Sequence, residues 1–388
     1  MLIFPNRSYL NNFGSIVKKA TLIFSVTNDL SYDQRMQRIC STLATNGYKV
    51  LLVGRRRKSS IPLQSLPFQQ KRLNCFFDKG LLFYIEYNIK LFFYLLFQPA
   101  NALCAIDLDT ILPVWAVSTL KKLPRLYDAH ELFTEQKEII SRKHIHRFWL
   151  AIEQFAVPKF KNGYTVNEFI VQELNRRYQV QYGIIRNMPV KNTINLSNSS
   201  TLLEVTNPTI LYQGAVNEGR CFETLIPAMQ LVNAHLLIIG TGNFFHQTKA
   251  LIEKYELQHK ITLAGAIEPF QLKQITPLAF CGLTLFENKG LNQFYSLANR
   301  FFDYIEAGIP QIAMNYPEYA AINNLYNIAL LINEPTIEQI AKALNNLLQN
   351  DVLYNKLKAN TAKASRELNW HTEEEKLLAI WQQIIPVN

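Results

Sequence analysis

The sequence predicts an α/β protein with two doubly wound domains that face a central cleft. The chain has 388 residues, which is too long for one ordinary core and suits two. Short apolar runs alternate with helical patterns in both halves, as in parallel sheets wrapped by helices. A polar stretch rich in Asn and Ser, residues 191–207, separates the halves and is the expected linker.

The first predicted domain spans residues 1–190. A helical pattern follows its first apolar run and ends at Gly47, and a longer helix is expected over 145–158. Each remaining apolar run is short and bounded by polar or turn residues, which is typical of buried strands. The expected strands are 20–27, 48–54, 101–109, 124–130, 163–167 and 182–187.

The second predicted domain, residues 208–365, repeats this scheme with a helix at 221–232. The tail, 366–388, is expected to form a helix that packs back on the first domain. Ligands of such sheets bind at the carboxyl ends of the strands, so the site is expected in the cleft between the domains. The expected strands are 208–214, 234–240, 260–265, 281–286 and 310–315.

The positive charge is concentrated in the first half. Residues 1–190 hold 26 Lys and Arg against 13 Asp and Glu, and the rest holds 14 against 17, in agreement with the overall net charge of +10. This asymmetry predicts an anionic partner for the first half, either nucleic acid or a lipid surface. A charge bias that serves solubility alone is the alternative.

Residues 81–97 are the most apolar stretch, but they include Glu86, Asn88 and Lys90. This stretch is too short and too charged at its centre to be expected to span a membrane. Glu86 and Lys90 have the spacing of a helical ion pair. Either the segment is a core helix whose Phe, Tyr, Leu and Ile wall is buried, or it is an interfacial helix among lipid headgroups.

The cysteines and the N-terminal residues indicate a reducing, cytoplasmic environment. Five cysteines are an odd number, and they are widely spaced without a C-x-x-C motif, so buried free thiols are expected. The first residues contain Pro5 and Arg7 within a short apolar run and have no small-residue cleavage site. They therefore do not fit a signal peptide.

The first candidate site is the loop after the predicted strand at 208–214. Gly214 ends this strand, and Arg220 lies just before the next predicted helix. Free backbone N–H groups at a helix start, together with a guanidinium, form a natural diphosphate site. An ordinary turn would show the same glycines.

The second candidate site lies within residues 285–310. Glu287 follows a predicted strand in a loop that contains Gly290, and Asn299, Arg300 and Asp303 surround the start of a helix. The Asp303 carboxylate could hold ribose hydroxyls, while Arg300 and free amides could hold phosphate. A capping Asn with an acidic first turn is the purely local explanation.

The third candidate is His130, which follows the strand at 124–130 beside Asp128 and Glu131. Two nearby patterns are interpreted as coincidental. Asp107-x-Asp109 is too short to identify a metal site, and Gly240-x-Gly242 lacks the third glycine of a dinucleotide-binding motif, which disfavours a nicotinamide dehydrogenase. Zinc-site, P-loop and nucleophile-elbow motifs are not found in the sequence.

Eight motifs in order give the chain a resemblance to the GT-B glycosyltransferases, with two Rossmann-like domains, and within them to the large retaining family 4 (group 1). The resemblance covers nearly the whole chain. The motifs are SVTNDLSYDQR, DAHE, YQGAVNEGR, LLIIGTGN, ITLAG, FENKGL, LANRFFDYIEAGIP and ELNW.

The resemblance implies a glycosyltransferase that moves a sugar from a nucleotide-diphosphate sugar, bound by the second domain, to an acceptor on the first. Arg220 matches the basic residue on the diphosphate. Glu287 matches the acid that contacts the transferred sugar, and Asp303 matches the acid that holds the ribose. His130 matches the histidine that approaches the donor sugar. Gly214, Gly290, Asn299 and Arg300 complete the predicted donor site, and no metal or other cofactor is expected.

Three positions depart from the family pattern. Glu287 and Asp303 lie sixteen positions apart, farther than is usual in the family, which indicates an inserted loop, NQFYSLAN. The second acid is Asp instead of Glu. Ala215 replaces a basic residue, with Arg300 as a possible substitute.

The expected acceptor is a glycan or lipid-linked molecule in cell-surface glycan synthesis. The protein is expected to be cytoplasmic and to bind this acceptor at the inner leaflet of the membrane. An anionic membrane surface is therefore an expected partner. Nucleic acid is not, because carboxylates at 287 and 303 would repel a polyanion. A nucleotide-sugar 2-epimerase of the same fold and a non-catalytic basic binding protein are the alternatives.

Overall fold

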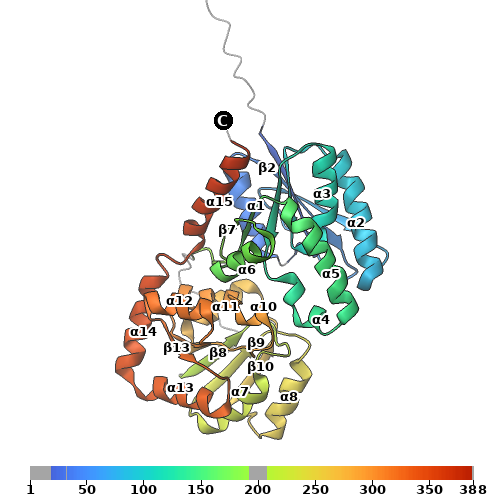
Figure 1. Ribbon diagram of the computed structural model, residues 1–388. Coiled ribbons are helices and arrows are strands. Elements are labelled where there is room, and N and C mark those ends of the chain that lie inside the picture. Colours follow the sequence, from blue (N-terminus) through green and yellow to red (C-terminus); the bar gives the residue numbers. More distant parts are fainter. Residues whose placement is uncertain (1–18, 32, 192–207, 387–388) are drawn as a thin grey trace, which may run out of the picture.

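Figure 1 shows the computed structural model of the protein, which describes residues 19–31, 33–191 and 208–386. Two α/β domains lie one above the other in this view, each with a central sheet covered by helices. The expected linker falls, from residue 192 on, outside the described residues. The predicted fold class is confirmed.

The first domain contains a seven-stranded parallel sheet. Neighbouring β1 (Thr21–Ser25) and β4 (Ala102–Ile106) start its two halves, and the strand order is β3-β2-β1-β4-β5-β6-β7. Such a reversal places a ligand crevice at the carboxyl ends of the strands. The other strands are β2 (Lys49–Arg56), β3 (Gln69–Asn74), β5 (Arg125–Ala129), β6 (Asn162–Thr165) and β7 (Gly183–Ile184).

Helices cover both faces of this sheet, so its central strands β1, β4 and β5 are buried along most of their length. The first helix begins where the Asp33 side chain accepts a hydrogen bond from the Met36 N–H, and it buries Met36, Ile39 and Leu43 on one face. The helices are α1 (Gln34–Thr45), α2 (Gly80–Phe97), α3 (Ile111–Leu120), α4 (Lys137–Ile140), α5 (Lys143–Ala156) and α6 (Glu168–Tyr178).

The second domain repeats the scheme with six parallel strands. They are β8 (Thr209–Gln213), β9 (His235–Ile239), β10 (Ile261–Gly265), β11 (Cys281–Thr284), β12 (Gln311–Met314) and β13 (Ala329–Ile332), in the order β10-β9-β8-β11-β12-β13. The helices are α7 (Phe222–Ala228), α8 (Phe245–Lys254), α9 (Pro269–Ile275), α10 (Leu291–Phe294), α11 (Asn299–Glu306), α12 (Pro317–Tyr326), α13 (Ile337–Gln349) and α14 (Asp351–Ala364).

The last helix, α15 (Trp370–Ile384), lies beside α1 of the first domain (Figure 1). The Trp370 indole N–H donates to the Thr42 hydroxyl at 2.9 Å, and the Trp381 ring centroid lies 5.3 Å from that of Phe24. Both tryptophans are buried. The end of the chain therefore completes the core of the domain in which the chain begins.

Helix α2 differs from the core interpretation of residues 81–97. Only Phe83, Tyr87, Leu91 and Leu95 are buried, so the expectation that the whole aromatic and aliphatic wall is buried was wrong. The predicted Glu86–Lys90 ion pair is present at 2.5 Å. The physical reason is that one stripe of the helix packs against the core and α3, while its other side faces outward.

The turns after β8 and β9 meet so closely that Gly240 cannot hold a side chain. Its φ is +143°, and an added Cβ would lie 1.8 Å from the carbonyl oxygen of Gly214. We expect Gly240→Ala to lower the free energy of unfolding by roughly 2–4 kcal/mol, because backbone displacement and a Gly-only conformation both cost energy. Gly265→Ala is the control: its φ is +74°, nothing lies within 4 Å, and a loss of only about 1 kcal/mol is expected. Equal losses in urea denaturation would contradict this account.

Candidate active site in the cleft between the domains

The two domains enclose a cleft of about 730 Å³ at the carboxyl ends of their strands. Its walls include six of the predicted site residues, namely His130 from the first domain and Gly214, Arg220, Asn299, Arg300 and Asp303 from the second. Glu287 and Gly290 are not among the lining residues. The fold thus brings residues that are 170 positions apart in sequence to one cavity.

Two arginines of the second domain share one aromatic ring. The Arg220 guanidinium carbon lies 4.3 Å from the Phe286 ring centroid, and that of Arg300 lies 4.8 Å from it. Arg300 also lies over Tyr212 at 4.4 Å and donates to the Gln213 carbonyl at 3.3 Å. Aromatic faces hold guanidinium groups by cation–π attraction, so the two cations are fixed side by side.

These two cations lack a counter-charge in the described part of the chain. Neither Arg220 nor Arg300 forms an ion pair with a described carboxylate, and the Arg220 Nε has no hydrogen-bond partner there. Burial lowers the pKa of Arg220, and the nearby Arg300 charge lowers it further. An anion would relieve both effects. Two planar, multi-donor guanidiniums are suited to the oxygens of a diphosphate.

Asp303 lies one turn into α11, on the same side of the cleft. Its Oδ2 accepts a hydrogen bond of 3.0 Å from the side-chain amide of Gln213, whose own oxygen accepts from the Thr276 hydroxyl at 2.8 Å. Burial raises the pKa of Asp303 to about 6. The second carboxylate oxygen faces no described donor, so it can accept a ligand hydroxyl.

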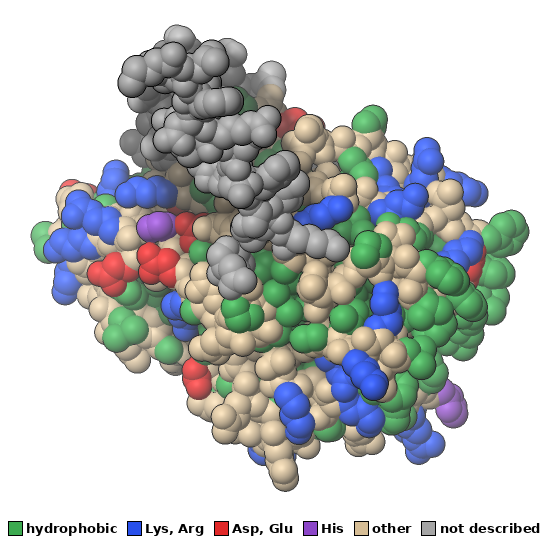
Figure 2. Space-filling view, turned by 90° about the horizontal axis from the view of Figure 1, so that it is seen from above, with side chains coloured by type: hydrophobic (Ala, Val, Ile, Leu, Met, Phe, Trp, Pro, Cys, Tyr) green, Lys and Arg blue, Asp and Glu red, His purple; other side chains and the backbone are tan. Residues whose placement is uncertain are grey.

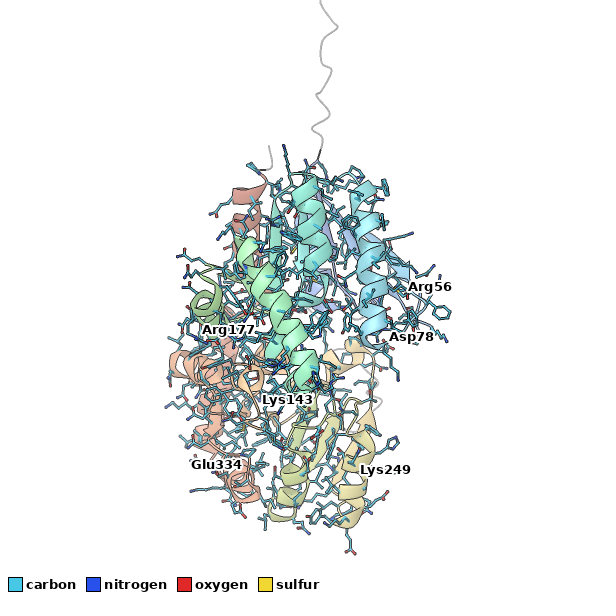
Figure 3. The ribbon with its side chains drawn as sticks, turned by 45° about the vertical axis from the view of Figure 1, so that its right-hand side comes forward. Arg56, Asp78, Lys143, Arg177, Lys249 and Glu334 are labelled. Atoms are coloured by element: carbon cyan, nitrogen blue, oxygen red, sulfur yellow. The ribbon has the colours of Figure 1, made fainter. Side chains whose placement is uncertain are left out.

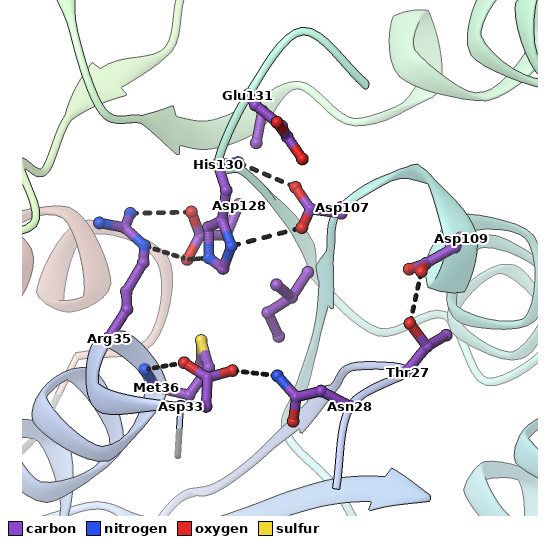
Figure 4. Close-up of polar contacts among 12 residues, drawn as sticks. Thr27, Asn28, Asp33, Arg35, Met36, Asp107, Asp109, Asp128, His130 and Glu131 are labelled. Carbon is purple, nitrogen blue, oxygen red and sulfur yellow. Dashed lines mark hydrogen bonds and ion pairs between the residues drawn. The ribbon is translucent and has the colours of Figure 1, made fainter. Parts of the chain in front are cut away.

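His130 lines the same cleft as Arg220, Arg300 and Asp303 but belongs to the first domain. Its imidazole lies between two carboxylates (Figure 4). Its Nδ1 lies 3.3 Å from Asp107 Oδ2 and its Nε2 lies 3.5 Å from Asp128 Oδ2, while its backbone N–H donates to Asp107 Oδ1 at 3.0 Å. Burial lowers the pKa of His130, but the two carboxylates outweigh it and raise this pKa well above its ordinary value. The two carboxylates therefore orient the imidazole and favour its protonated form.

The acids near His130 bind different partners: Asp128 binds Arg35, and Asp109 binds Thr27. The Arg35 guanidinium donates two hydrogen bonds to the Asp128 carboxylate, from Nη2 at 2.9 Å and from Nε at 3.3 Å (Figure 4). Asp109 turns away from Asp107 and accepts from the Thr27 hydroxyl at 2.5 Å, so these two acids do not converge on one point (Figure 4). Among the described residues, no three His, Cys, Asp or Glu side chains are grouped as metal ligands would be.

Glu287 and Gly290 lie beside the cleft. The Glu287 carboxylate pairs with Lys289 at 2.7 Å, and its N–H donates to the Gly219 carbonyl at 3.0 Å. Gly290, with a φ of +111°, starts α10 and approaches the Glu135 carbonyl of the first domain. Both residues thus lie at the edge of the site, in the loop that directly follows Phe286, the ring that both arginines contact.

The loop between Glu287 and Asp303 reaches across the cleft. The Asn292 amide donates to Glu131 at 2.8 Å, and the Asn187 amide donates to Asn299 at 2.6 Å. Tyr295 accepts from Asn167 at 2.6 Å through its carbonyl, and its ring stacks on Phe169 with centroids 5.3 Å apart. The residues that lengthen the spacing between Glu287 and Asp303 therefore form a segment that contacts the first domain across the cleft.

Several residues that line or support the cleft were not predicted as site residues. They are Asn28, Asp33, Gln34, Arg35, Asp107, Asn187, Gln213 and Asn292. Most follow the carboxyl end of a strand, which is the signal that could have indicated them. Gln213 is the last residue of β8, and Asp107 comes directly after β4.

Solved structures with the same architecture are glycosyltransferases. Sucrose-phosphate synthase from Thermosynechococcus elongatus is 16% identical, with 94% of this chain and 99% of that chain covered and a TM-score of 0.73. HepE from Anabaena in complex with UDP-glucose is 11% identical, with 94% and 99% covered and a TM-score of 0.73. WaaG, a glycosyltransferase involved in lipopolysaccharide biosynthesis, is 16% identical, with 94% and 100% covered and a TM-score of 0.70. A search of curated proteins finds no significant match.

The fold and the cleft thus define a two-domain α/β protein of the GT-B type, with its ligand site between the domains. Residues 196–364 match the family described as "Glycosyl transferases group 1". This match extends over the second domain and agrees with the family that the motifs resemble.

The raised pKa of Asp303 makes a prediction about stability. The folded chain disfavours this carboxylate, so its cost is small near pH 4, grows as the pH rises to about 6 and stays constant above that. We expect Asp303→Asn to be more stable than the wild type by about 1–3 kcal/mol at pH 8 and nearly equal to it at pH 4. Asp78→Asn, at an exposed position, is the control and should show no such gain. A pH-independent difference in urea denaturation would refute the assignment.

Proposed function

We propose that the protein transfers a sugar from a nucleotide-diphosphate sugar to a glycan or lipid-linked acceptor. The observation that carries this proposal is the pair of guanidiniums on Phe286, which have no described carboxylate partner and line the same cleft as Asp303 and His130. Arg220 and Arg300 would bind the diphosphate, and Asp303 the ribose hydroxyls. Asn299 and the free N–H groups at the start of α11 would add donors.

UDP is the first nucleotide to test, because HepE was solved with UDP and with UDP-glucose. In the transfer, the bond between the anomeric carbon and the diphosphate oxygen breaks, and the nucleoside diphosphate leaves with the electron pair. The acceptor hydroxyl oxygen bonds to that carbon, and its proton passes to the departing phosphate oxygen. Arg220 and Arg300 stabilise the negative charge that develops on the leaving group.

We further propose that the reaction retains the anomeric configuration, as the resemblance to a retaining family implies. We also propose that it needs no metal, because two guanidiniums can supply the charge that a cation would otherwise bring to the diphosphate. His130 would donate a hydrogen bond to the donor sugar from the opposite domain. Closure of the cleft would exclude water and limit hydrolysis of the donor. Glu287 would reach the sugar only if the Glu287–Lys289 pair at the edge of the cleft rearranges.

The acceptor and the location of the protein belong to the same proposal. A basic first half and an apolar, exposed α2 support an acceptor held at a membrane surface, on the cytoplasmic side. Cell-surface glycan synthesis would use such an arrangement. WaaG, which shares the fold, is described as acting in lipopolysaccharide biosynthesis.

Calorimetric titration with UDP tests the diphosphate site. We expect Arg220→Ala to weaken UDP binding by roughly 10- to 100-fold, because a charge-assisted hydrogen bond contributes about 1.5–3 kcal/mol. Arg176→Ala is the control, since Arg176 is 71% exposed and pairs with Glu173 on α6. Unchanged UDP affinity in the Arg220 variant, or no stabilisation of the wild type by UDP, GDP, ADP or CMP, would refute the proposed donor site.

Chelation tests the role of a metal. We expect EDTA to change the rate of UDP release from UDP-glucose by less than about twofold, because the guanidiniums supply the charge at the leaving group. His130→Ala should reduce this rate by at least about tenfold with little change in UDP affinity. Loss of turnover on chelation that magnesium restores would overturn metal independence. Conversion of UDP-glucose to an epimer without acceptor would favour the 2-epimerase alternative.

A further inference from the structure

Helix α2 exposes an apolar surface that nothing in the described chain covers. Ile89 and Phe93 are each 54% exposed, and Phe97 is 77% exposed. The loop before the helix adds Phe76, at 85%. Large contiguous apolar surfaces are uncommon on soluble proteins and mark interaction sites.

This surface continues over two neighbouring helices. Figure 3 shows α2, α3 and α5 side by side on one flank of the first domain, and Figure 2 shows hydrophobic and basic side chains gathered at one edge of the molecule. Phe93 and Trp115 line one hollow of 360 Å³ between α2 and α3, and the Trp115 ring meets Phe155 of α5 at 4.9 Å. A second hollow of 430 Å³ lies between α2 and β3. We call this surface the α2–α3–α5 face, defined by Ile89, Phe93, Phe97, Trp115 and Phe155.

The length and apolarity of α2, an 18-residue helix, would allow it to cross a membrane, but its contacts tie it to the domain. The buried Tyr87 hydroxyl donates to the Val26 carbonyl at 2.6 Å, and the Asn88 amide donates to the Asp109 carbonyl at 3.0 Å. The Lys121 ammonium caps the carbonyls at the helix end. The helix therefore meets any bilayer from the side, with its exposed face.

Lys and Arg side chains border the α2–α3–α5 face, with the Lys159 ammonium 3.7 Å from the Phe155 ring centroid. Residues 140–161 hold five Lys and Arg, namely Arg142, Lys143, Arg147, Lys159 and Lys161, against one acid, Glu153, which is buried. Glu86, on α2, is paired with Lys90 and accepts from the N–H groups of Phe76 and Phe77. Two copies of this face would bring like charges together, so a dimer is disfavoured.

We infer that the α2–α3–α5 face docks on the surface of an anionic phospholipid bilayer. Phe93 and Phe97 enter the boundary between headgroups and acyl chains, and the two hollows accept acyl segments. The bordering cations contact lipid phosphates and add an electrostatic attraction to the surface. Aromatic side chains flanked by Lys and Arg are the composition that membrane interfaces favour.

The placement of this face relative to the cleft extends the proposed function. In Figure 3, Lys143 lies at the end of α5 nearest the second domain, and Ile140 just before it approaches Gly290 of the cleft edge. A bilayer that covers this face and also contacts this end of α5 would approach the edge of the cleft. A lipid-linked acceptor in that bilayer would meet the donor without leaving the membrane.

Co-sedimentation of the full-length protein with vesicles tests the inference. The vesicles contain phosphatidylcholine alone or with phosphatidylglycerol, at low and high salt. We expect binding to the anionic vesicles that weakens with salt, and a loss of at least tenfold in the double variant Ile89→Ser/Phe93→Ser. Phe270→Ser, at a 61% exposed position of α9 in the second domain, is the control and should bind as the wild type does.

A second pair of variants tests the cations. Lys143→Glu/Arg147→Glu should lose binding at low salt, whereas Lys249→Glu, on α8 of the second domain (Figure 3), should not. Equal binding of all variants, or binding to neutral vesicles alone, would overturn the inference. So would a wild type that ignores vesicles but forms a dimer that Ile89→Ser/Phe93→Ser dissolves. UDP affinity, measured on the same variants, should stay unchanged, which separates failure of docking from failure of the donor site.

Discussion

Two positive charges held against one aromatic ring are the constraint on which the cleft depends. Burying a guanidinium without a counter-charge costs free energy, and within the described residues Arg220 and Arg300 are compensated by Phe286, Tyr212 and one carbonyl. The surrounding backbone is shaped to the same purpose, because Gly214 and Gly240 meet too closely to carry a side chain at residue 240. An anion in the cleft would complete this arrangement, and a diphosphate has the charge and the oxygen atoms to do so.

Much of this domain could be predicted because its signals are local. Gly214 and Arg220 flank the loop after β8, and Asn299, Arg300 and Asp303 start α11, so position relative to one strand or helix was enough to identify them. The same rule identified His130 at the end of β5. Glu287 followed the rule as well, but its carboxylate turns to Lys289 at the edge of the cleft, a choice that the order of residues does not reveal.

The rest depends on contacts between distant segments. Asp107 was dismissed as half of a chance D-x-D pattern, yet the strand order places β4 next to β5 and so sets Asp107 against His130. Strand β3 was missed because its residues, QQKRLN, are polar at a sheet edge. The exposure of α2 could not be predicted from its composition, because buried and exposed apolar faces contain the same residue types. The tertiary contacts of the helix, chiefly with α3 and the core, decide between them.

The bridge across the cleft links the two halves of the site. Glu131 follows His130 directly and accepts from Asn292, while Asn299, which precedes Arg300, accepts from Asn187 of the first domain. His130 and Arg300 are thus each adjacent in sequence to a residue that forms a hydrogen bond between the domains. If the domains parted, these contacts would break together, and His130 would leave the neighbourhood of the arginines. The contacts between the domains and the placement of His130 opposite the arginines therefore depend on the same segment, the longer loop between Glu287 and Asp303.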